Sequence, residues 1–260
     1  MSGFQSDLLA GQVALITGGG SGIGATIAES LAAHGARVGL IGRKLEKLEA
    51  VAATIVAAGG QVECAPCDVR EPDALRAAVQ RVTERFGRLD ILVNSAAGNF
   101  VAPAATLTEK GFSTVVDIDL KGTFNACKAV FQALSERGGS IINISATLQY
   151  LGTPFQVHAA SAKAGIDAMT RTLAVEWGAL AIRVNAIAPG PIDDTEGMKR
   201  LAPGPLKEKM ARRIPLGRFG TRQEIADAVL FLCSPMSAYT TGAILVVDGG
   251  QWIASQVMEF

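Results

Sequence analysis

The chain has 260 residues, 49% of them hydrophobic, and its 24 lysine and arginine residues balance its 24 aspartate and glutamate residues. This length and apolar content suit one large α/β domain, so we expect residues 1–260 to form a single domain. A neutral chain without a basic run lacks the charge pattern for nucleic-acid binding or attraction to an anionic membrane, which leaves a small molecule as the expected partner.

Short runs rich in β-branched residues alternate with longer segments of helical periodicity, as in βαβ units around a parallel sheet. The predicted strands are Val13–Thr17, Arg37–Ile41, Gln61–Pro66, Ile91–Asn94, Ser140–Ile144, Ile182–Ile187 and Ala243–Val247. The predicted helices are Ile23–His34, Lys44–Ala58, Pro72–Phe86, Thr108–Arg137, Phe155–Trp177 and Arg222–Cys233. Most strand runs lack polar alternation, so we expect an α/β fold with a doubly wound, seven-stranded parallel sheet.

A glycine-rich loop follows the first predicted strand and opens the first predicted helix, reading Thr17-Gly18-Gly19-Gly20-Ser21-Gly22-Ile23-Gly24. In this setting glycine lets the backbone approach a pyrophosphate, and the helix N-terminus offers N–H groups to its charge. The pattern predicts a Rossmann dinucleotide-binding unit. The expected cofactor contacts are Gly18, Gly20, Ser21, Gly22, Ile23 and Gly24.

The end of the second predicted strand distinguishes NAD from NADP. An NAD-binding unit ends this strand with an acid that binds the ribose 2′-hydroxyl. Here Gly42 stands at that position and Arg43 follows, so a 2′-phosphate would meet a cation instead of a repelling carboxylate. The sequence therefore predicts NADPH/NADP+ as the cofactor. Asp68, after the third strand, either accepts from the adenine amino group or caps the following helix.

Glycines mark most of the expected helix ends, where a left-handed residue caps the last turn. They are Gly35, Gly59, Gly87, Gly138 and Gly178. The segment 189–215 breaks the alternation, since it is rich in proline and glycine and carries the charged run Met198-Lys199-Arg200. We expect this segment to form a lid with a short helix over the site.

No targeting or membrane segment stands out. The N-terminal residues lack the basic and apolar regions of a signal peptide, and no apolar run reaches the roughly 18 residues of a membrane span. The chain ends Val257-Met258-Glu259-Phe260, unlike a Ser-Lys-Leu peroxisomal address. We expect a cytoplasmic protein without membrane insertion and without a metal site.

Together with the glycine loop and Asp68, four further motifs resemble the short-chain dehydrogenase/reductase family over about residues 9–251. They are Asn94-Ser95-Ala96-Ala97, Ser161-Ala162-Lys163, Pro189-Gly190 and Val247-Asp248-Gly249-Gly250. The resemblance implies that residues 1–260 are one NADP-binding domain of this family, usually assembled as a homotetramer. It also implies that Lys163 hydrogen-bonds the nicotinamide ribose. The backbone after the sixth strand is then expected to contact the nicotinamide end through Pro189, Gly190, Ile192 and Thr195.

The chain departs from this family where ketone reductases keep their catalytic residues. The position of the tyrosine, four residues before Lys163, is Ala159, and that of the serine, thirteen residues earlier, is Ala146. In place of the asparagine of an Asn-x-x-Gly motif stands Asp119. Alanine cannot deliver a proton, and loss of a positioned acid typically costs about 10²- to 10⁴-fold in rate. The change favours a different reduction, a neighbouring proton donor, or an inactive NADPH-binding protein.

These departures and the runs around them resemble the 2,4-dienoyl-CoA reductases, above all the peroxisomal type. The runs are Ala96–Phe100, Asp117–Asp119, Val157–Ala159, Ala174–Gly178, Ala188–Ile192 and Thr195–Gly197. The resemblance implies NADPH-dependent reduction of a 2,4-dienoyl-CoA to a 3-enoyl-CoA in unsaturated fatty-acid β-oxidation. It assigns the proton source to Asp119, acting through an ordered water, and places Phe100 against the acyl or thioester part of this acyl-CoA substrate.

Such a reaction does not need the missing hydroxyls. Hydride from NADPH adds at Cδ, charge spreads to the thioester oxygen and a proton is needed at Cα, so no alkoxide forms. Alternatives stay open: Asp119 as a helix-terminal hydrogen-bonding group, and Tyr150 or His158 as the proton donor. Arg200 is a candidate for binding a CoA phosphate, and Arg70 is a candidate for contacts near the adenine ends of the ligands. The alternative for both is an exposed, solvated arginine. The alternative functions are another short-chain reductase or dehydrogenase with an atypical proton donor, and a non-catalytic NADPH-binding protein.

Overall fold

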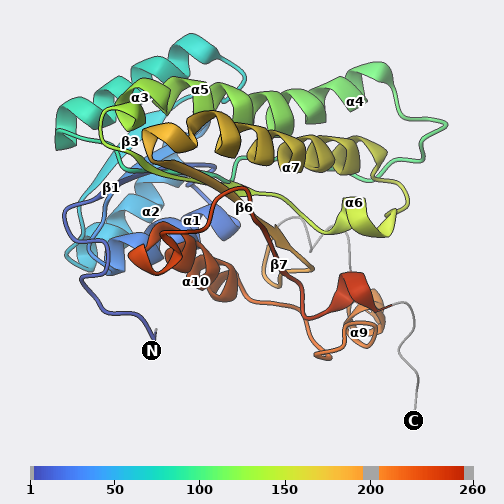
Figure 1. The fold of residues 1–260 in the computed structure, drawn as a ribbon. Helices are drawn as coiled ribbons and strands as arrows, with labels where there is room; N and C mark the ends of the chain where they lie inside the picture. The colour runs from blue at the N-terminus through green and yellow to red at the C-terminus, as the bar shows by residue number, and fades with distance from the viewer. Residues whose placement is uncertain (1–2, 196–204, 255–260) are drawn as a thin grey trace.

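The computed structural model describes residues 3–195 and 205–254. Seven parallel strands form one sheet in the order β3-β2-β1-β4-β5-β6-β7 (Figure 1). The strands are β1 (Val13–Thr17), β2 (Arg37–Gly42), β3 (Val62–Pro66), β4 (Ile91–Asn94), β5 (Gly139–Ile144), β6 (Ile182–Pro189) and β7 (Ile244–Val247). The predicted fold class and all seven predicted strands are confirmed.

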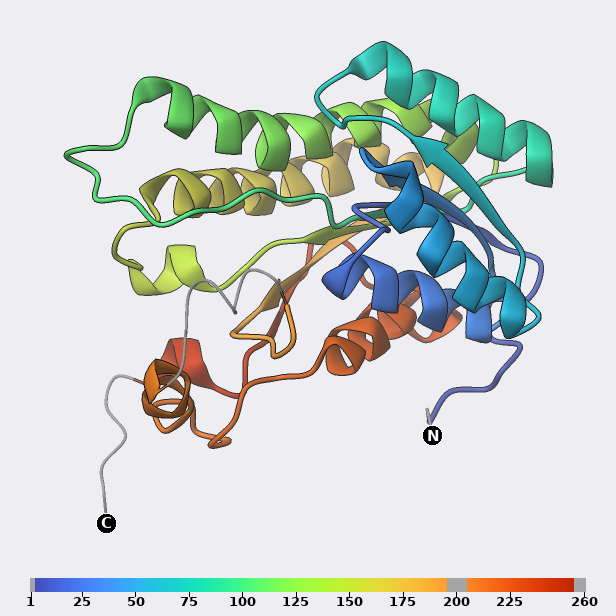
Figure 2. The same ribbon diagram turned by 180° about the vertical axis from the view of Figure 1, so that it is seen from behind.

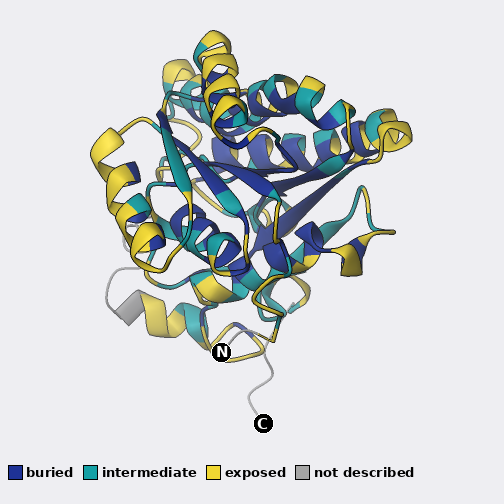
Figure 3. Ribbon diagram, turned by 90° about the vertical axis from the view of Figure 1, so that its left-hand side faces the viewer, coloured by how far each residue is buried: buried dark blue, intermediate teal, exposed yellow. Residues whose placement is uncertain are grey.

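Helices cover both faces of this sheet (Figures 1 and 2). One face packs against α1 (Gly22–Ala33), α2 (Leu45–Ala57) and α10 (Arg222–Cys233). The other packs against α3 (Pro72–Phe86), α5 (Gly122–Ser135) and α7 (Val157–Trp177). The shorter described α-helices are α4 (Glu109–Val116), α6 (Leu148–Leu151) and α9 (Pro205–Ala211). Figure 3 shows the buried central strands between helices whose outer surfaces are exposed.

The order of the strands reverses between β1 and β4. Their last residues, Thr17 and Asn94, are paired neighbours in the sheet. The chain leaves β1 toward one side of the sheet and β4 toward the other, so the loops that follow them diverge. Open α/β sheets bind ligands in the crevice at this point, outside the carboxyl ends of the strands. The fold therefore brings the glycine loop and the segment after Asn94 to one site.

The helix predicted over Thr108–Arg137 is interrupted. α4 ends at Val116, a π-helical turn η1 (Asp117–Lys121) follows, and α5 begins at Gly122. The N–H of Gly122 donates to the carbonyl oxygen of Asp117, five residues earlier, which inserts one residue into the helical register. A single turn of this kind leaves the apolar periodicity of a long helix almost intact, so the sequence pattern did not reveal it.

Four of the five predicted glycine caps are left-handed, with φ between 78° and 93° at Gly35, Gly59, Gly87 and Gly138. The prediction is wrong for Gly178, whose φ is −58°. The chain continues there into the 3-10 turn η2 (Gly178–Leu180), and Ala181, with φ of 57°, takes the left-handed conformation instead.

Part of the predicted lid is described. β6 leads into it at Pro189, and α9 is the short helix expected within it. The charged run Met198-Lys199-Arg200 lies outside the described residues. Within the two described ranges, no helix is both long and apolar enough to span a membrane.

Candidate active site

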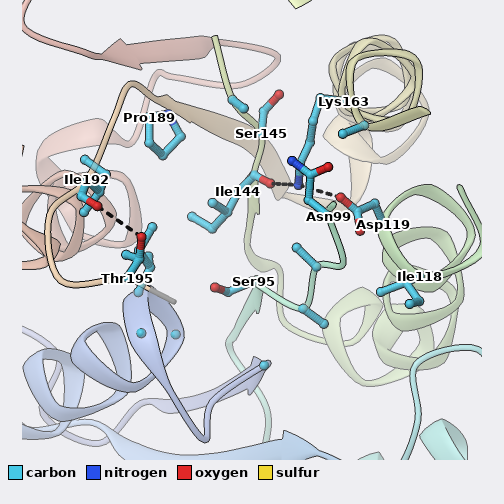
Figure 4. Close-up of a pocket in the computed structure, with 18 of the residues that line it drawn as sticks. Ser95, Asn99, Ile118, Asp119, Ile144, Ser145, Lys163, Pro189, Ile192 and Thr195 are labelled. Atoms are coloured by element: carbon cyan, nitrogen blue, oxygen red, sulfur yellow. Dashed lines mark hydrogen bonds and ion pairs between the residues drawn. The ribbon is translucent and has the colours of Figure 1, made fainter. Parts of the chain in front are cut away.

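A pocket of about 730 Å³ lies at the carboxyl ends of the strands (Figure 4). Its lining includes residues of the glycine loop after β1, of the turn after β2, of the first part of α7 and of the segment 148–156. Elements that are far apart in the sequence thus meet at the crevice expected from the reversal of strand order.

The glycine loop is packed too closely for side chains at two positions. A Cβ atom on Gly18 would lie 2.8 Å from the carbonyl oxygen of Ser95, and one on Gly24 would lie 2.4 Å from the carbonyl oxygen of Gly18. At Gly22, φ is +56° and an added Cβ would meet nothing within 4 Å. Gly22 also begins α1 and lines the pocket. Open space before a helix N-terminus fits the pyrophosphate of a dinucleotide.

Cations gather where β2 ends. Arg43, Lys44 and Lys47 line the pocket beside Gly42, which carries no side chain to oppose an anion. The arrangement suits a ligand with negative charge on its ribose.

Asp68 lines the same end of the pocket, and its carboxylate is held by Arg70. Nε of Arg70 donates to Oδ1 of Asp68 at 3.0 Å, and a terminal nitrogen donates to Oδ2 at 2.6 Å. These hydrogen bonds hold the pKa of the Asp68 carboxyl below its ordinary value. The N-cap of α3 is Glu71, so the alternative that Asp68 caps this helix is wrong.

Each residue predicted to contact the cofactor lines this one pocket. The set is Gly18, Gly20, Ser21, Gly22, Ile23, Gly24, Arg43, Asp68, Lys163, Pro189, Gly190, Ile192 and Thr195. The hydroxyl of Thr195 donates to the carbonyl oxygen of Ile192 at 3.1 Å, which closes the turn after β6 (Figure 4). The residues present therefore fit a dinucleotide along the length of the pocket.

Asp119 and Lys163 form a buried ion pair on the pocket wall, with Oδ2 of Asp119 3.4 Å from Nζ of Lys163 (Figure 4). Oδ1 of Asp119 accepts from the N–H of Gly98 at 2.7 Å. Nζ of Lys163 donates to the carbonyl oxygen of Ile144 at 2.9 Å. Backbone groups that follow β4 and end β5 thus fix both charged side chains.

The π-helical turn η1 places Asp119 on this wall. Asp119 is the middle residue of that turn and is 1% exposed. Its own carbonyl oxygen accepts from the hydroxyl of Thr123 at 2.6 Å, which gives a polar partner to the backbone of the irregular turn. Single π turns within α-helices are frequent at functional sites.

Both alanines at the usual hydroxyl positions, Ala146 and Ala159, line the pocket. So does Ser145, which the sequence reasoning missed although it directly precedes Ala146. The Ser145 hydroxyl donates to Oδ1 of Asp167, a residue on α7, at 2.5 Å. Ser145 could have been predicted as a pocket residue because it is next to Ala146, the position of the usual serine.

Neither alternative proton donor is among the described residues that line the pocket. The Tyr150 hydroxyl donates to Oδ2 of Asp167 at 2.5 Å. Burial and, after it, this hydrogen bond raise the pKa of the Tyr150 phenol. His158 is fully buried, and its ring centroid lies 4.5 Å from that of Phe100.

Two of the three predicted substrate residues are described, and neither lines this pocket. Among the described residues of the lining, Phe100 is absent, although Asn99 and Val101 on either side of it are present. Arg70 is likewise absent and is paired with Asp68, while Arg200 lies outside the described residues. Apolar lining comes instead from Val101, Leu148, Leu151 and Phe155. The last three lie in or beside a helix too short to produce a periodic pattern.

Comparisons with known proteins identify the family. The family model described as enoyl-(acyl carrier protein) reductase matches residues 18–251. The peroxisomal 2,4-dienoyl-CoA reductase [(3E)-enoyl-CoA-producing] of Danio rerio is 51% identical over 97% of this chain and 85% of its own length. The Rattus norvegicus protein of the same name is 49% identical over 96% of this chain and 87% of its own length. The chain belongs to the short-chain dehydrogenase/reductase family.

A solved structure agrees with this assignment. The citronellol catabolism dehydrogenase of Pseudomonas aeruginosa PAO1 is 41% identical, with a TM-score of 0.86, over 96% of this chain and 99% of its own. Membership in the short-chain dehydrogenase/reductase family makes the protein an oxidoreductase and implies a nicotinamide cofactor. The glycine loop and the pocket fit such a cofactor.

The predicted cytoplasmic location is contradicted, because these relatives within the short-chain dehydrogenase/reductase family are named peroxisomal. The prediction rested on three absences: a signal peptide, a membrane-length apolar run and a Ser-Lys-Leu-type ending. An absence of known signals does not itself indicate a compartment, and the names of the relatives outweigh it.

Proposed function

We propose that this protein reduces a 2,4-dienoyl-CoA to a 3-enoyl-CoA with NADPH, a step of unsaturated fatty-acid β-oxidation. The observation that carries the proposal is the pocket wall, where Asp119 pairs with Lys163 and Ala146 and Ala159 stand at the usual hydroxyl positions. Relatives that are 51% and 49% identical carry this activity in their names.

NADPH is proposed over NADH because of the charges after β2. A 2′-phosphate at this end of the pocket would meet Arg43, Lys44 and Lys47. A charge-assisted hydrogen bond is worth roughly 1.5–3 kcal/mol, which corresponds to about a ten- to hundredfold preference. Asp68 opposes the phosphate little, since its carboxylate is already paired with Arg70.

NADPH, when bound, would supply hydride for Cδ of the diene. The protein's own task then lies along the conjugated system, where the thioester oxygen gathers negative charge and Cα needs a proton. We assign delivery of this proton to the carboxyl group of Asp119 on the pocket wall: as an ordered water protonates Cα, the carboxyl gives its own proton to that water and is then reprotonated from solvent. Lys163 holds this carboxylate and would also bind the nicotinamide ribose. Ketone reduction requires an acid at the carbonyl oxygen, which neither Ala146 nor Ala159 can provide.

Contacts to the rest of the substrate are also proposals. Arg200 is proposed for a CoA phosphate, and Arg70 for contacts near the adenine ends of the ligands. Phe100 is proposed to support the acyl or thioester part from behind the pocket-lining residues Asn99 and Val101. We infer a homotetramer of these single-domain chains, the usual assembly of the family.

The test is to incubate the protein with NADPH and 2,4-hexadienoyl-CoA, follow oxidation of the nucleotide and identify the product by NMR. We expect the 3-enoyl thioester. A 2-enoyl product would place the proton at Cγ and contradict the role given to Asp119. Reduction of simple ketones but not of the thioester would favour another short-chain reductase, and NADPH binding without turnover would favour a non-catalytic role.

A further inference from the structure

The buried carboxylate of Asp167 accepts from three side chains. Oδ1 accepts from the Ser145 hydroxyl at 2.5 Å, and Oδ2 accepts from the Tyr150 hydroxyl at 2.5 Å and from Nε2 of Gln149 at 2.8 Å. Asp167 is only 3% exposed, on α7, one helical turn after Lys163. A buried carboxylate is stable only when its oxygens are satisfied, and here three neutral donors satisfy them.

These donors belong to the segment that builds one side of the pocket. Gln149 and Tyr150 lie in α6, and Ser145 directly follows β5. The other α6 residues, Leu148 and Leu151, line the pocket and supply part of its apolar surface. Asp167 is thus connected to the pocket through α6.

α6 is a short helix with little burial of its own. It is four residues long and none of its residues is buried. A helix this short is unstable in isolation, because the free-energy cost of nucleating a helix exceeds the stabilisation from the hydrogen bonds of one turn. It ends at Gly152, in the left-handed region with φ of 62°. The hydrogen bonds from Gln149 and Tyr150 to Asp167 therefore contribute substantially to holding α6 at the pocket wall.

The same contacts extend to the C-terminal side of the pocket. The ring centroid of Tyr150 lies 5.5 Å from that of Trp252. The backbone N–H of Trp252 donates to Oδ2 of Asp248 at 2.7 Å, and the adjacent Gln251 lines the pocket. Tyr150 therefore connects α7, α6 and the segment after β7 in one set of contacts.

We propose that Asp167 is a positioning residue, whose carboxylate holds Ser145 and Tyr150 and thereby fixes α6 as the wall that binds the acyl part of the substrate. The hydroxyls of Ser145 and Tyr150 both donate to Asp167, so neither replaces the missing acid at Ala146 or Ala159. The identity of the substrate rests on the proposed function. The anchoring of α6 does not, since it is a property of the free protein.

Tyr150→Phe is the sharpest variant, because it removes one donor to Asp167 and keeps the ring beside Trp252. The chain has two tyrosines, and Tyr239 is fully exposed, so Tyr239→Phe is a matched control. Hydrogen exchange followed by mass spectrometry of peptides covering residues 145–153 reports on α6 without any substrate. We expect exchange to be roughly tenfold faster in Tyr150→Phe than in the parent or the control.

Steady-state kinetics with NADPH and 2,4-hexadienoyl-CoA give the second readout. We expect Tyr150→Phe to raise KM for the thioester roughly tenfold while kcat and the Kd for NADPH stay unchanged. Ser145→Ala removes a second donor to Asp167 and should shift exchange and KM in the same direction, so two independent variants test the proposal.

Two results would overturn the proposal. Unchanged exchange in residues 145–153 would show that the Asp167 bonds do not hold α6. A fall in kcat of about a hundredfold or more at constant KM would make Tyr150 the proton donor instead. If the parent protein does not turn over the thioester, the proposed function fails, and the exchange experiment still decides whether Asp167 positions α6.

Discussion

Oδ2 of Asp119 lies 3.4 Å from Nζ of Lys163, while Oδ1 is bound by the backbone N–H of Gly98. One oxygen of the carboxylate is thus fixed to the backbone, and the other faces the ammonium group on the pocket wall. This pair stands where ketone reductases of the family combine an asparagine, a serine, a tyrosine and a lysine. In the proposed function, the proton chemistry of the site therefore falls to this single carboxyl group.

Replacing that carboxyl should therefore cost turnover but not cofactor binding. We expect Asp119→Asn to lower kcat for the dienoyl thioester by roughly 10²- to 10⁴-fold, because the positioned acid is lost. The Kd for NADPH, measured by fluorescence titration, should stay unchanged. Asp117→Asn is the control, since Asp117 lies in the same π turn but pairs with Lys121 at the surface. Near-normal turnover in Asp119→Asn would remove Asp119 from the mechanism.

The preference for the 2′-phosphate should depend on Arg43. We expect Arg43→Ala to reduce the ratio of NADPH to NADH affinity by about ten- to hundredfold, through loss of one charge-assisted bond. Isothermal titration with both nucleotides measures the ratio. Arg76→Ala, which removes an exposed arginine on α3 that pairs with Asp73, should leave the ratio unchanged. An unaltered ratio in Arg43→Ala would contradict the proposed phosphate contact.

The glycine loop should tolerate no methyl group at Gly24. A Cβ there would lie 2.4 Å from the carbonyl oxygen of Gly18, so Gly24→Ala must displace the loop. We expect at least tenfold weaker NADPH binding and a loss of about 1–3 kcal/mol in the free energy of unfolding, as for other overpacked positions.

Gly178→Ala is the control, because it makes the same substitution at a position with room for the methyl group. Gly178 has helical φ and ψ of −58° and −37°, and an added Cβ would meet nothing within 4 Å. This variant should gain about 0.5–1 kcal/mol of stability. Urea unfolding of both variants measures the difference, and equal stability of Gly24→Ala and the parent would refute the close packing of the loop.

Low pH should reduce the stability that Glu224 gives to the N-terminus of α10. Hydrogen bonds from Arg218 and from the backbone of Thr221 lower the pKa of Glu224 to about 2, from an ordinary value of 4.5. A lowered native pKa means that the native state favours the ionised carboxylate. Its contribution to stability is therefore complete above about pH 4.5 and is lost as the pH falls toward 2.

Glu224→Gln should accordingly reduce the dependence of unfolding free energy on pH between about pH 5 and pH 3. Glu136→Gln, at an exposed glutamate at the end of α5, is the control and should keep the slope of the parent. Urea unfolding at several pH values measures this slope. A Glu224→Gln variant with the parent's slope would show that the carboxylate is not held as described.

The strands were predictable from the sequence because most of them are short apolar runs, as expected for strands that are covered by helices on both faces. Val13–Thr17 and Ile91–Asn94 match the structure at both ends. The glycine loop and Arg43 were also predictable, since their chemistry follows from residue type and from their place after a strand. Lys163 could be placed only through the family resemblance.

What escaped prediction depends on contacts between distant segments. Asp167 looked like an ordinary polar residue of a long helix, and its role appears only when Ser145 and Tyr150 fold against it. Arg70 was predicted for the substrate, but a carboxylate two residues away holds its guanidinium. Phe100 was predicted to contact the acyl or thioester part of the substrate, but it is absent from the described pocket lining and its ring packs on His158.

The extra residue of the π turn η1 (Asp117–Lys121) has a consequence for how this site can change. A π turn takes up its extra residue locally, so the helices on either side of it keep their packing. Deleting one residue from η1 would close it into an ordinary α-helical turn and move Asp119 from its present place on the wall. A single codon deletion is therefore expected to remove the Asp119–Lys163 pair while α4 and α5 keep their contacts.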